Sequence, residues 1–235
     1  MDFLQFQGKD FEKMRYTHIF IDMDGTLVNS APGVTHSVAY ALEKCGITPP
    51  PAEELTCFIG PPLVWSFAEY YGMNEEECQK ALAYYREYYR AKGILECYAY
   101  DGIEELLKAM TDMGLICVLA TSKPHVFANQ ILEYKKLNGY FSFVSGPEFD
   151  GTRNEKAEVI AYAMEQLGLT DPSKILMLGD REHDTKGAAI NGVDSVGALW
   201  GFGDAEELLS TGAKAVFETP KDLQDALCRE DFEAF

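Results

Sequence analysis

Two aspartates at the end of a short apolar run are the residues of this sequence best suited to chemistry. The stretch IFIDMDGTL places Asp22 and Asp24 with one residue between them, directly after β-branched and aromatic residues that favour a buried strand. The carboxyl ends of such strands are where open α/β sheets bind ligands. Two carboxylates this close repel each other unless a metal ion binds them or one is protonated. A nucleophilic aspartate beside one that can move a proton suits covalent phosphoryl transfer, although Asp24-Gly25 alone is also a common turn.

A hydroxyl-bearing segment follows the apolar run that begins at Leu115. It reads Thr121-Ser122-Lys123-Pro124. A hydroxyl group and free backbone N–H groups at the start of a helix form a ready anion site. The simpler interpretation is that Thr121 or Ser122 caps the helix, with Pro124 in its first turn.

A lysine at the start of a later predicted helix is the third feature. Lys156 lies at the end of the helix where the macrodipole disfavours a cation, at a cost of about 0.3–1 kcal/mol. Beside paired carboxylates, a lysine would neutralise charge and steady phosphoryl oxygens. The alternative is a solvated surface lysine, which most lysines are.

A further pair of acids follows another apolar run. Asp180 would lie in a loop and Asp184 in the first helical turn, so that with Asp22 they offer hard oxygen ligands suited to Mg²⁺. Locally, helix capping and the helix dipole explain these acids equally well. His183, between them, is expected at the surface. Independent local roles would not predict acids, a hydroxyl, a lysine and acids at four successive core segments in this order.

The elements that must position these residues alternate along most of the chain. Apolar runs and helical patterns follow one another, which predicts a parallel sheet flanked by helices. We expect this α/β core at residues 16–30 and 98–235, an inserted helical domain at 31–97, and a leader at 1–15. Tyr84, Tyr85, Tyr88 and Tyr89 recur at helical spacing and are expected to pack inside the insertion; the alternative is a shelf on which a nucleobase stacks. The predicted elements include helices at 63–71 and 126–134 and strands at 115–120, 141–145, 174–178 and 196–199.

Composition narrows the class of protein. A net charge of −18 over 235 residues argues against binding a nucleic acid polymer, which needs a basic face. The six cysteines form no C-x-x-C pair, so we expect no zinc site and a reducing, cytoplasmic setting. No signal peptide is visible and no apolar run is long enough to span a bilayer, so no membrane partner is expected.

Taken together, the segment Asp22–Thr26, Thr121, Lys156 and the Asp180/Asp184 pair resemble the four motifs of the haloacid dehalogenase superfamily. The resemblance extends over nearly the whole chain. The sequence ALWGFG at 198–203 further resembles the phosphoglycolate phosphatase-like branch, which carries a helical cap after the first strand. The fold implied is a Rossmann-like parallel sheet flanked by helices, with an inserted α-helical cap domain that decides specificity.

The resemblance also implies roles for the site residues. Asp22 would accept the phosphoryl group, and Asp24 would protonate the leaving oxygen and later activate water. Thr121 would hold a phosphoryl oxygen, and Lys156 would bridge the phosphate and Asp22. The implied phosphate-binding residues are Gly25, Thr121, Ser122 and Lys156, and the implied Mg²⁺-binding residues are Asp22, Asp24 through its carbonyl, Asp180 and Asp184.

The function implied is a Mg²⁺-dependent phosphatase that hydrolyses a small phosphorylated metabolite through an aspartyl-phosphate, as a monomer or homodimer. The alternatives are a 5'-nucleotidase or pyrophosphatase of the same superfamily, a sugar-phosphate mutase, and a non-enzymatic signalling switch phosphorylated on aspartate. Asp24-Gly25-Thr26 differs from the Asp-Gly-Val usual in the mutases. The large insertion and a proton-carrying Asp24 speak against the switch.

Overall fold

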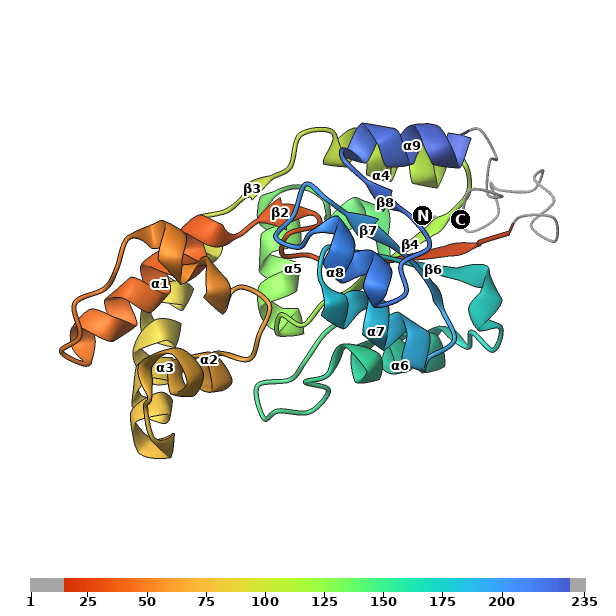
Figure 1. The fold of residues 1–235 in the computed structure, drawn as a ribbon. Helices are drawn as coiled ribbons and strands as arrows, with labels where there is room; N and C mark the ends of the chain where they lie inside the picture. The colour runs from red at the N-terminus through yellow and green to blue at the C-terminus, as the bar shows by residue number, and fades with distance from the viewer. Residues whose placement is uncertain (1–14, 229–235) are drawn as a thin grey trace. The chain divides into compact units, whose positions relative to one another are not determined.

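The computed structural model describes residues 15–228, so the expected leader lies almost entirely outside the described residues. A six-stranded sheet forms the centre of the larger unit (Figure 1). All of its strand pairings are parallel. Its strands, in sheet order, are β5 (Phe141–Ser145), β4 (Ile116–Ala120), β1 (His18–Ile21), β6 (Ile175–Gly179), β7 (Asp194–Ala198) and β8 (Val216–Phe217).

The central strand β1 is short and apolar because it is covered on both faces. Ile19, Phe20 and Ile21 have no exposed surface, as expected for a strand inside a parallel sheet. β1 lies between β4 and β6, with Ile21 opposite Leu119 and Leu178. The three carboxyl ends therefore come together at one edge of the sheet.

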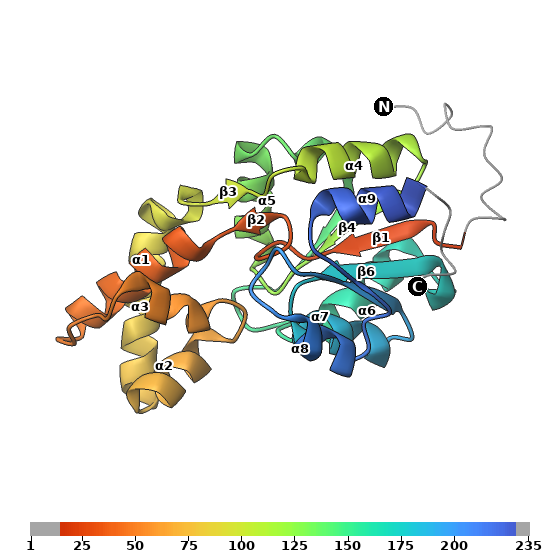
Figure 2. The ribbon, with the colours of Figure 1, turned by 45° about the horizontal axis from the view of Figure 1, so that its top comes forward.

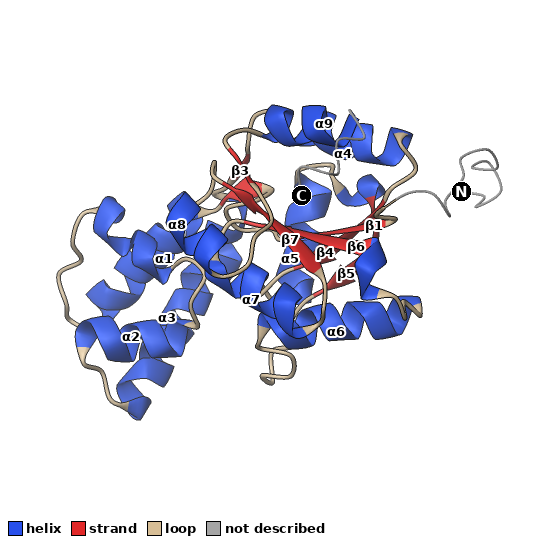
Figure 3. Cartoon of the chain, turned by 45° about the vertical axis from the view of Figure 1, so that its right-hand side comes forward, coloured by secondary structure: helices blue, strands red, loops and turns tan. Residues whose placement is uncertain are grey.

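Helices cover both faces of this sheet, with α4 and α9 on one side and α6 and α7 on the other (Figure 3). Phe20, Val118 and Met177 of the sheet share a buried cluster with Val159 and Ile160 of α6. The helices of this unit are α4 (Ile103–Asp112), α5 (His125–Tyr134), α6 (Lys156–Leu167), α7 (Glu182–Ile190), α8 (Ala205–Ser210) and α9 (Pro220–Cys228), with 3₁₀ turns at η4 (Asn138–Tyr140) and η5 (Pro172–Lys174).

The second unit is helical and interrupts the first (Figure 2). It spans Val28–Ala99, and its two ends pair as short antiparallel strands, with Val28 opposite Ala99. An insertion whose ends meet in this way leaves and re-enters the sheet unit at neighbouring points. Its elements are β2 (Val28–Asn29), α1 (Ala31–Lys44), η2 (Ala52–Phe58), α2 (Leu63–Tyr71), α3 (Glu75–Ala91), η3 (Gly93–Leu95) and β3 (Tyr98–Ala99).

Local sequence signals account for the helices of the insertion. Asn74 and Glu77 form a reciprocal capping box that starts α3, and Gly72 ends α2 in the left-handed conformation. Tyr85 and Tyr89 are buried and stack with 5.4 Å between ring centroids. These two tyrosines therefore pack inside the helical unit.

The predicted α/β class with a helical insertion is confirmed. α2 and β5 have the predicted bounds, and β4 and β6 begin one residue later than predicted. β7 begins earlier than expected, at Asp194, because it pairs with Leu176 of β6 from that residue. Within residues 15–228, no helix has the length and apolar content needed to cross a lipid bilayer.

Candidate active site

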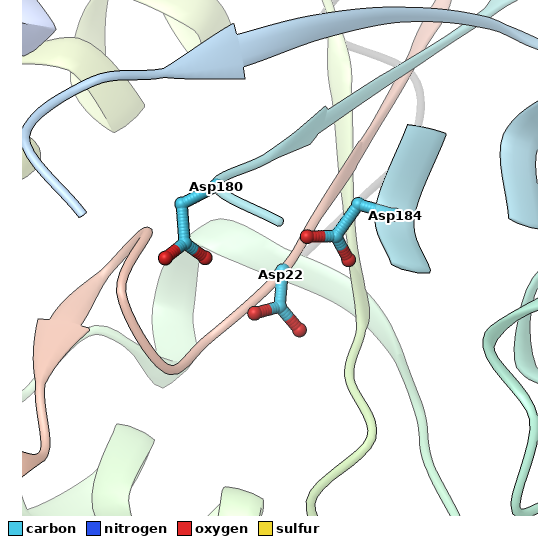
Figure 4. Close-up of side chains that lie close together, drawn as sticks. All are labelled: Asp22, Asp180 and Asp184. Carbon is cyan, nitrogen blue, oxygen red and sulfur yellow. The ribbon is translucent and has the colours of Figure 1, made fainter. Parts of the chain in front are cut away.

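Three aspartates from different parts of the sequence meet at the carboxyl edge of the sheet. Asp22 follows β1, Asp180 follows β6, and Asp184 lies in the first turn of α7 (Figure 4). All three are buried, and one carboxylate oxygen from each lies within 4.8 Å of the others. The structure thus brings together three acids that were expected to bind Mg²⁺, and that role stays a prediction.

Sheet register and helix capping explain why they meet. β1 and β6 run parallel and in register, and the Asp22 backbone N–H donates to the Leu178 carbonyl at 2.9 Å. The chain then turns into α7, where the Arg181 N–H donates to Asp184 Oδ2 at 3.1 Å. An acid at this position also suits the positive end of the helix dipole. Asp184 is thus held by its own helix while its other oxygen remains directed at the site.

Lys156 is the cation of this cluster. Its Nζ atom donates to Asp22 Oδ1 at 2.6 Å and to the Ala120 carbonyl at 2.9 Å. It also lies 2.8 Å from Asp184 Oδ1, as an ion pair without hydrogen-bond alignment. Only 4% of the side chain is exposed, so the interpretation as a solvated surface lysine is wrong. Side chains in a first helical turn point back toward the N-terminus, which carries this lysine over the end of β4.

The pKa values of Asp22 and Asp180 are strongly raised. Burial raises the pKa of Asp22 to about 7; Lys156 opposes the shift, while Asp184 and Asp24 add to it. Burial, followed by the charges of Asp184 and Asp22, raises the pKa of Asp180 well above its ordinary value. Burial alone would lower the pKa of Lys156, but Asp184 and Asp22 outweigh it and the pKa is raised. The lysine therefore stays charged, and one ammonium faces a group of three acids.

Asp180 is clamped from two directions. Thr26 Oγ1 donates to its Oδ1 at 3.3 Å, and the Phe202 N–H donates to its Oδ2 at 2.8 Å. A Cβ on Gly201 would lie 2.4 Å from Asp180 Cβ, and one on Gly203 would lie 2.0 Å from the Asp180 carbonyl oxygen. The loop after β7 therefore packs directly on this aspartate. The pattern ALWGFG at 198–203 is visible in the sequence, but the pattern alone does not predict a role in the site.

Gly25 completes the enclosure of Asp180. Its φ of +88° is a conformation that other residues rarely adopt, and a Cβ there would lie 2.0 Å from Asp180 Oδ2. The Asp-Gly dipeptide is thus a turn and also part of the site. The two interpretations weighed for it are compatible.

Thr121 is buried after β4 and does not cap α5. The N-cap of α5 is Pro124, without a side-chain cap, and Thr121 Oγ1 instead accepts the Lys123 N–H at 3.1 Å. Ser122 is half-buried in the same turn. The simple capping interpretation therefore does not account for either hydroxyl.

Asp24 is oriented differently from the other acids. Its Oδ2 pairs with Lys123 Nζ at 3.0 Å, and its Oδ1 is buried without a hydrogen-bond partner in the part of the chain described. Its carboxylate is not part of the triad of Asp22, Asp180 and Asp184. Lys123 was not among the predicted site residues, and its place in the turn after β4 is the sequence signal that points to it.

The donor set fits a hard divalent cation. Three carboxylates offer oxygen ligands within a few ångströms, and a single lysine leaves their negative charge in excess. Oxygen donors of this kind suit Mg²⁺, and the absence of cysteine or histidine from the cluster disfavours zinc. The same edge of the sheet carries a buried hydroxyl at Thr121 and a lysine on Asp22, which are the groups an anion requires.

Comparison with known proteins agrees with this arrangement. Residues 19–198 match the haloacid dehalogenase-like hydrolase family. The chain is 42% identical to a 5'-nucleotidase of Pseudomonas aeruginosa over 83% of its own length and 88% of that protein. It is 34% identical to the tyrosine-protein kinase PtkA of Mycobacterium tuberculosis over 89% of its length and 72% of that protein. It is 28% identical to phosphoglycolate phosphatase 1 of P. aeruginosa, over 87% and 77% of the two lengths.

Among solved structures, a predicted phosphatase from Clostridium acetobutylicum superposes with a TM-score of 0.87 and 44% identity, covering 92% of this chain and all of that one. The matched region contains every acid of the triad and Lys156. Strand order, site geometry and sequence similarity agree: the chain belongs to the haloacid dehalogenase-like hydrolase family.

Proposed function

We propose that this protein is a Mg²⁺-dependent phosphatase that hydrolyses small phosphomonoesters through a phosphoryl group carried on Asp22. The observation that carries the proposal is the hydrogen bond of 2.6 Å between Lys156 and Asp22 inside a buried triad of acids. A purely structural salt bridge to Lys156 would need only one carboxylate. The two additional buried acids are explained by a cation bound for catalysis.

Asp22, the Asp24 carbonyl and Asp180 would hold the Mg²⁺ ion, with Asp184 beside them. When bound, the ion supplies charge that draws the substrate phosphate to the acids and stabilises the negative charge of phosphoryl transfer. With that charge beside them, the three buried carboxylates would stay ionised.

The residues of the chain divide the reaction between them. An Asp22 oxygen forms a bond to phosphorus as the bond from phosphorus to the leaving oxygen breaks, and Asp24 gives its proton to that oxygen. Asp24 then takes a proton from water, which attacks phosphorus and releases phosphate and the Asp22 carboxylate. Thr121, with Gly25 and Ser122 alongside, and Lys156 hold the phosphoryl oxygens throughout.

We further propose a 5'-nucleotide as the preferred substrate class. The 42% identity to a 5'-nucleotidase supports it above phosphoglycolate, whose phosphatase is 28% identical. The helical unit Val28–Ala99 is proposed to act as the cap that selects among phosphate esters. A panel containing nucleoside 5'-monophosphates, phosphoglycolate, pyrophosphate and a hexose phosphate tests this, with and without Mg²⁺. A preference for a substrate other than nucleotides would contradict the assignment of substrate class.

The central test is the Asp22→Asn variant. We expect turnover of p-nitrophenyl phosphate and of the best natural ester to fall by at least about 10⁴-fold, since the nucleophile is lost. The fold should persist, because an amide fits the same space, and circular dichroism and thermal unfolding check it. Substantial residual activity of the purified variant, and not of a contaminating phosphatase, would contradict covalent catalysis at this residue.

The 34% identity to PtkA supports a second candidate, transfer of a phosphoryl group to or from a protein tyrosine. Incubation with γ-labelled ATP and a tyrosine-containing protein separates the two. Release of inorganic phosphate without labelled protein supports the phosphatase, and label on tyrosine supports the transferase. The same phosphate measurement separates hydrolysis from a mutase, and decay of phospho-Asp22 within seconds separates it from a signalling switch.

A further inference from the structure

Asp24 has two carboxylate oxygens in different surroundings. Oδ2 lies 3.0 Å from Lys123 Nζ, and the two side chains are 18% and 8% exposed. Oδ1 is buried and accepts no hydrogen bond from any residue between 15 and 228. A buried oxygen without a donor is costly and is uncommon outside functional sites.

The position of Lys123 is fixed by its backbone. Its N–H donates to Thr121 Oγ1 at 3.1 Å, which closes the turn after β4. Gly146 lies against the other side of the turn, where a Cβ would be only 2.5 Å from the Lys123 carbonyl oxygen. The His125 N–H also donates to the Pro147 carbonyl at 3.2 Å. The turn is therefore held between β4 and the end of β5, which fixes the backbone position of Lys123.

The pairing of Lys123 with Asp24 is more than a surface ion pair. With so little exposure, solvent screens the two charges weakly. The contact thus holds the carboxyl plane of Asp24 at one edge. The other edge, at Oδ1, meets no donor among the described residues.

We propose that Lys123 is a positioning residue for Asp24. By holding Oδ2, it makes Oδ1 the oxygen that gives a proton to the leaving group and later takes one from water. Lys123 acts through Asp24 and not on the phosphoryl group. This inference rests on the proposed phosphatase function.

The test is a leaving-group series. Values of kcat/KM are measured for aryl phosphates whose phenols range from acidic (p-nitrophenol) to weakly acidic (phenol), in wild type, Lys123→Met, Lys123→Gln and Lys123→Arg. General acid catalysis contributes roughly 10²–10⁴-fold, and it matters most when the leaving oxygen is basic. We expect Lys123→Met to lose about 10- to 100-fold on phenyl phosphate and less than about threefold on p-nitrophenyl phosphate. The Arg variant should show a dependence of kcat/KM on the acidity of the leaving phenol close to that of wild type, because it keeps the positive charge.

A double-mutant cycle shows whether Lys123 acts through Asp24. In the Asp24→Asn background, Lys123→Met should change kcat/KM by less than about twofold, because coupled residues are non-additive. The matched control is Lys108→Met, which removes an exposed lysine–aspartate pair on α4 and should leave the whole series unchanged. If Lys123→Met does not fold, as judged by circular dichroism, the Gln variant, which retains a donor, is read in its place.

Three results would overturn the inference. An equal loss for every ester with a raised KM would mean that Lys123 binds the phosphate itself. An undiminished loss in the Asp24→Asn background would show that it acts independently of Asp24. If kcat/KM of Lys123→Met depends on the acidity of the leaving phenol as it does in wild type, Asp24 does not need Lys123 to position it. If wild type hydrolyses none of the esters, the proposed function fails, and that outcome is distinct from all three.

Discussion

At the scale of single residues, the site is defined by an excess of buried negative charge. Lys156 contacts both Asp22 and Asp184, whereas Asp180 is held by the neutral donors Thr26 and Phe202. Burial disfavours the ionised forms of Asp22 and Asp180, and the like charges of neighbouring acids add to the effect. Holding these acids together therefore costs stability, and the proposed Mg²⁺ would offset that cost.

Asp180→Asn tests this cost. The amide oxygen can still accept the Phe202 N–H and its NH₂ can donate to Thr26 Oγ1, so we expect the metal-free variant to be more stable by about 1–2 kcal/mol at pH 8. The pKa of Asp180 in the folded protein is raised above 3.8, so this carboxyl lowers the free energy of unfolding as pH rises. Asn does not titrate and has no such effect. The advantage of the variant should therefore grow from pH 5 to pH 8.

Chemical unfolding with EDTA and with Mg²⁺ measures both effects. Mg²⁺ should stabilise wild type and not the variant, and the variant should be inactive. Asp101→Asn, at an exposed aspartate, is the matched control and should change neither quantity. A variant less stable than wild type without metal would show that repulsion among the acids is not the dominant effect.

At the scale of elements, the strand ends bring the site residues together and the loops orient their side chains. The parallel pairing of β1 with β4 and β6 brings three carboxyl ends together, but it does not by itself aim the side chains. Aiming depends on the capping box of α7 and on the loop after β7, which donates the Phe202 N–H to Asp180. Glycines at the closest approaches let backbone pass against backbone.

Gly203→Ala tests the loop after β7. Its Cβ would lie 2.0 Å from the Asp180 carbonyl oxygen, so the loop must shift and carry the Phe202 N–H away from the carboxylate. We expect a loss of about 1–3 kcal/mol in stability, typical of overpacking, together with weaker Mg²⁺ binding.

The measurement is thermal unfolding over a Mg²⁺ titration. Gly139→Ala is the control, because nothing lies within 4 Å of the Cβ it would add. Equal effects of the two substitutions would argue that the loop after β7 has no part in holding Asp180.

At the scale of the whole molecule, the charge of the chain opposes its proposed substrates. The net charge of −18 repels a phosphate dianion, and the cations described at the site lie close to carboxylates. Such a field slows encounter and is screened by salt. The local attraction would therefore have to come from the proposed Mg²⁺ and the two lysines.

We accordingly predict that kcat/KM for a phosphomonoester rises with ionic strength. Between about 10 mM and about 150 mM salt the Debye length falls from about 30 Å to about 8 Å, and we expect roughly a two- to threefold rise at constant free Mg²⁺. The value of kcat should stay level, because it is set after the substrate has bound. A fall of kcat/KM with salt would mean that the positive field of the site outweighs the net charge.

The comparison of sequence and structure separates what each determined. The sequence predicted the parallel sheet, the helical insertion and the acids at strand ends, because apolar period and strand direction are local properties that leave few topologies. Lys156 was recognisable as a cation at an unfavourable helix end, but whether it was buried or solvated depended on what packed around it.

Only the tertiary structure decided the remaining contacts. The pairing of Lys123 with Asp24 and the contact of Thr26 with Asp180 join residues about a hundred positions or more apart. The contact of Phe202 with Asp180 spans only 22 positions but likewise depends on a loop. Loop conformations are set by close backbone approaches, as at Gly146 and Gly203, and no sequence period reports them. The sequence by itself thus determined which groups could do chemistry, and the packing of loops against strand ends decided which oxygen of each group faces which partner.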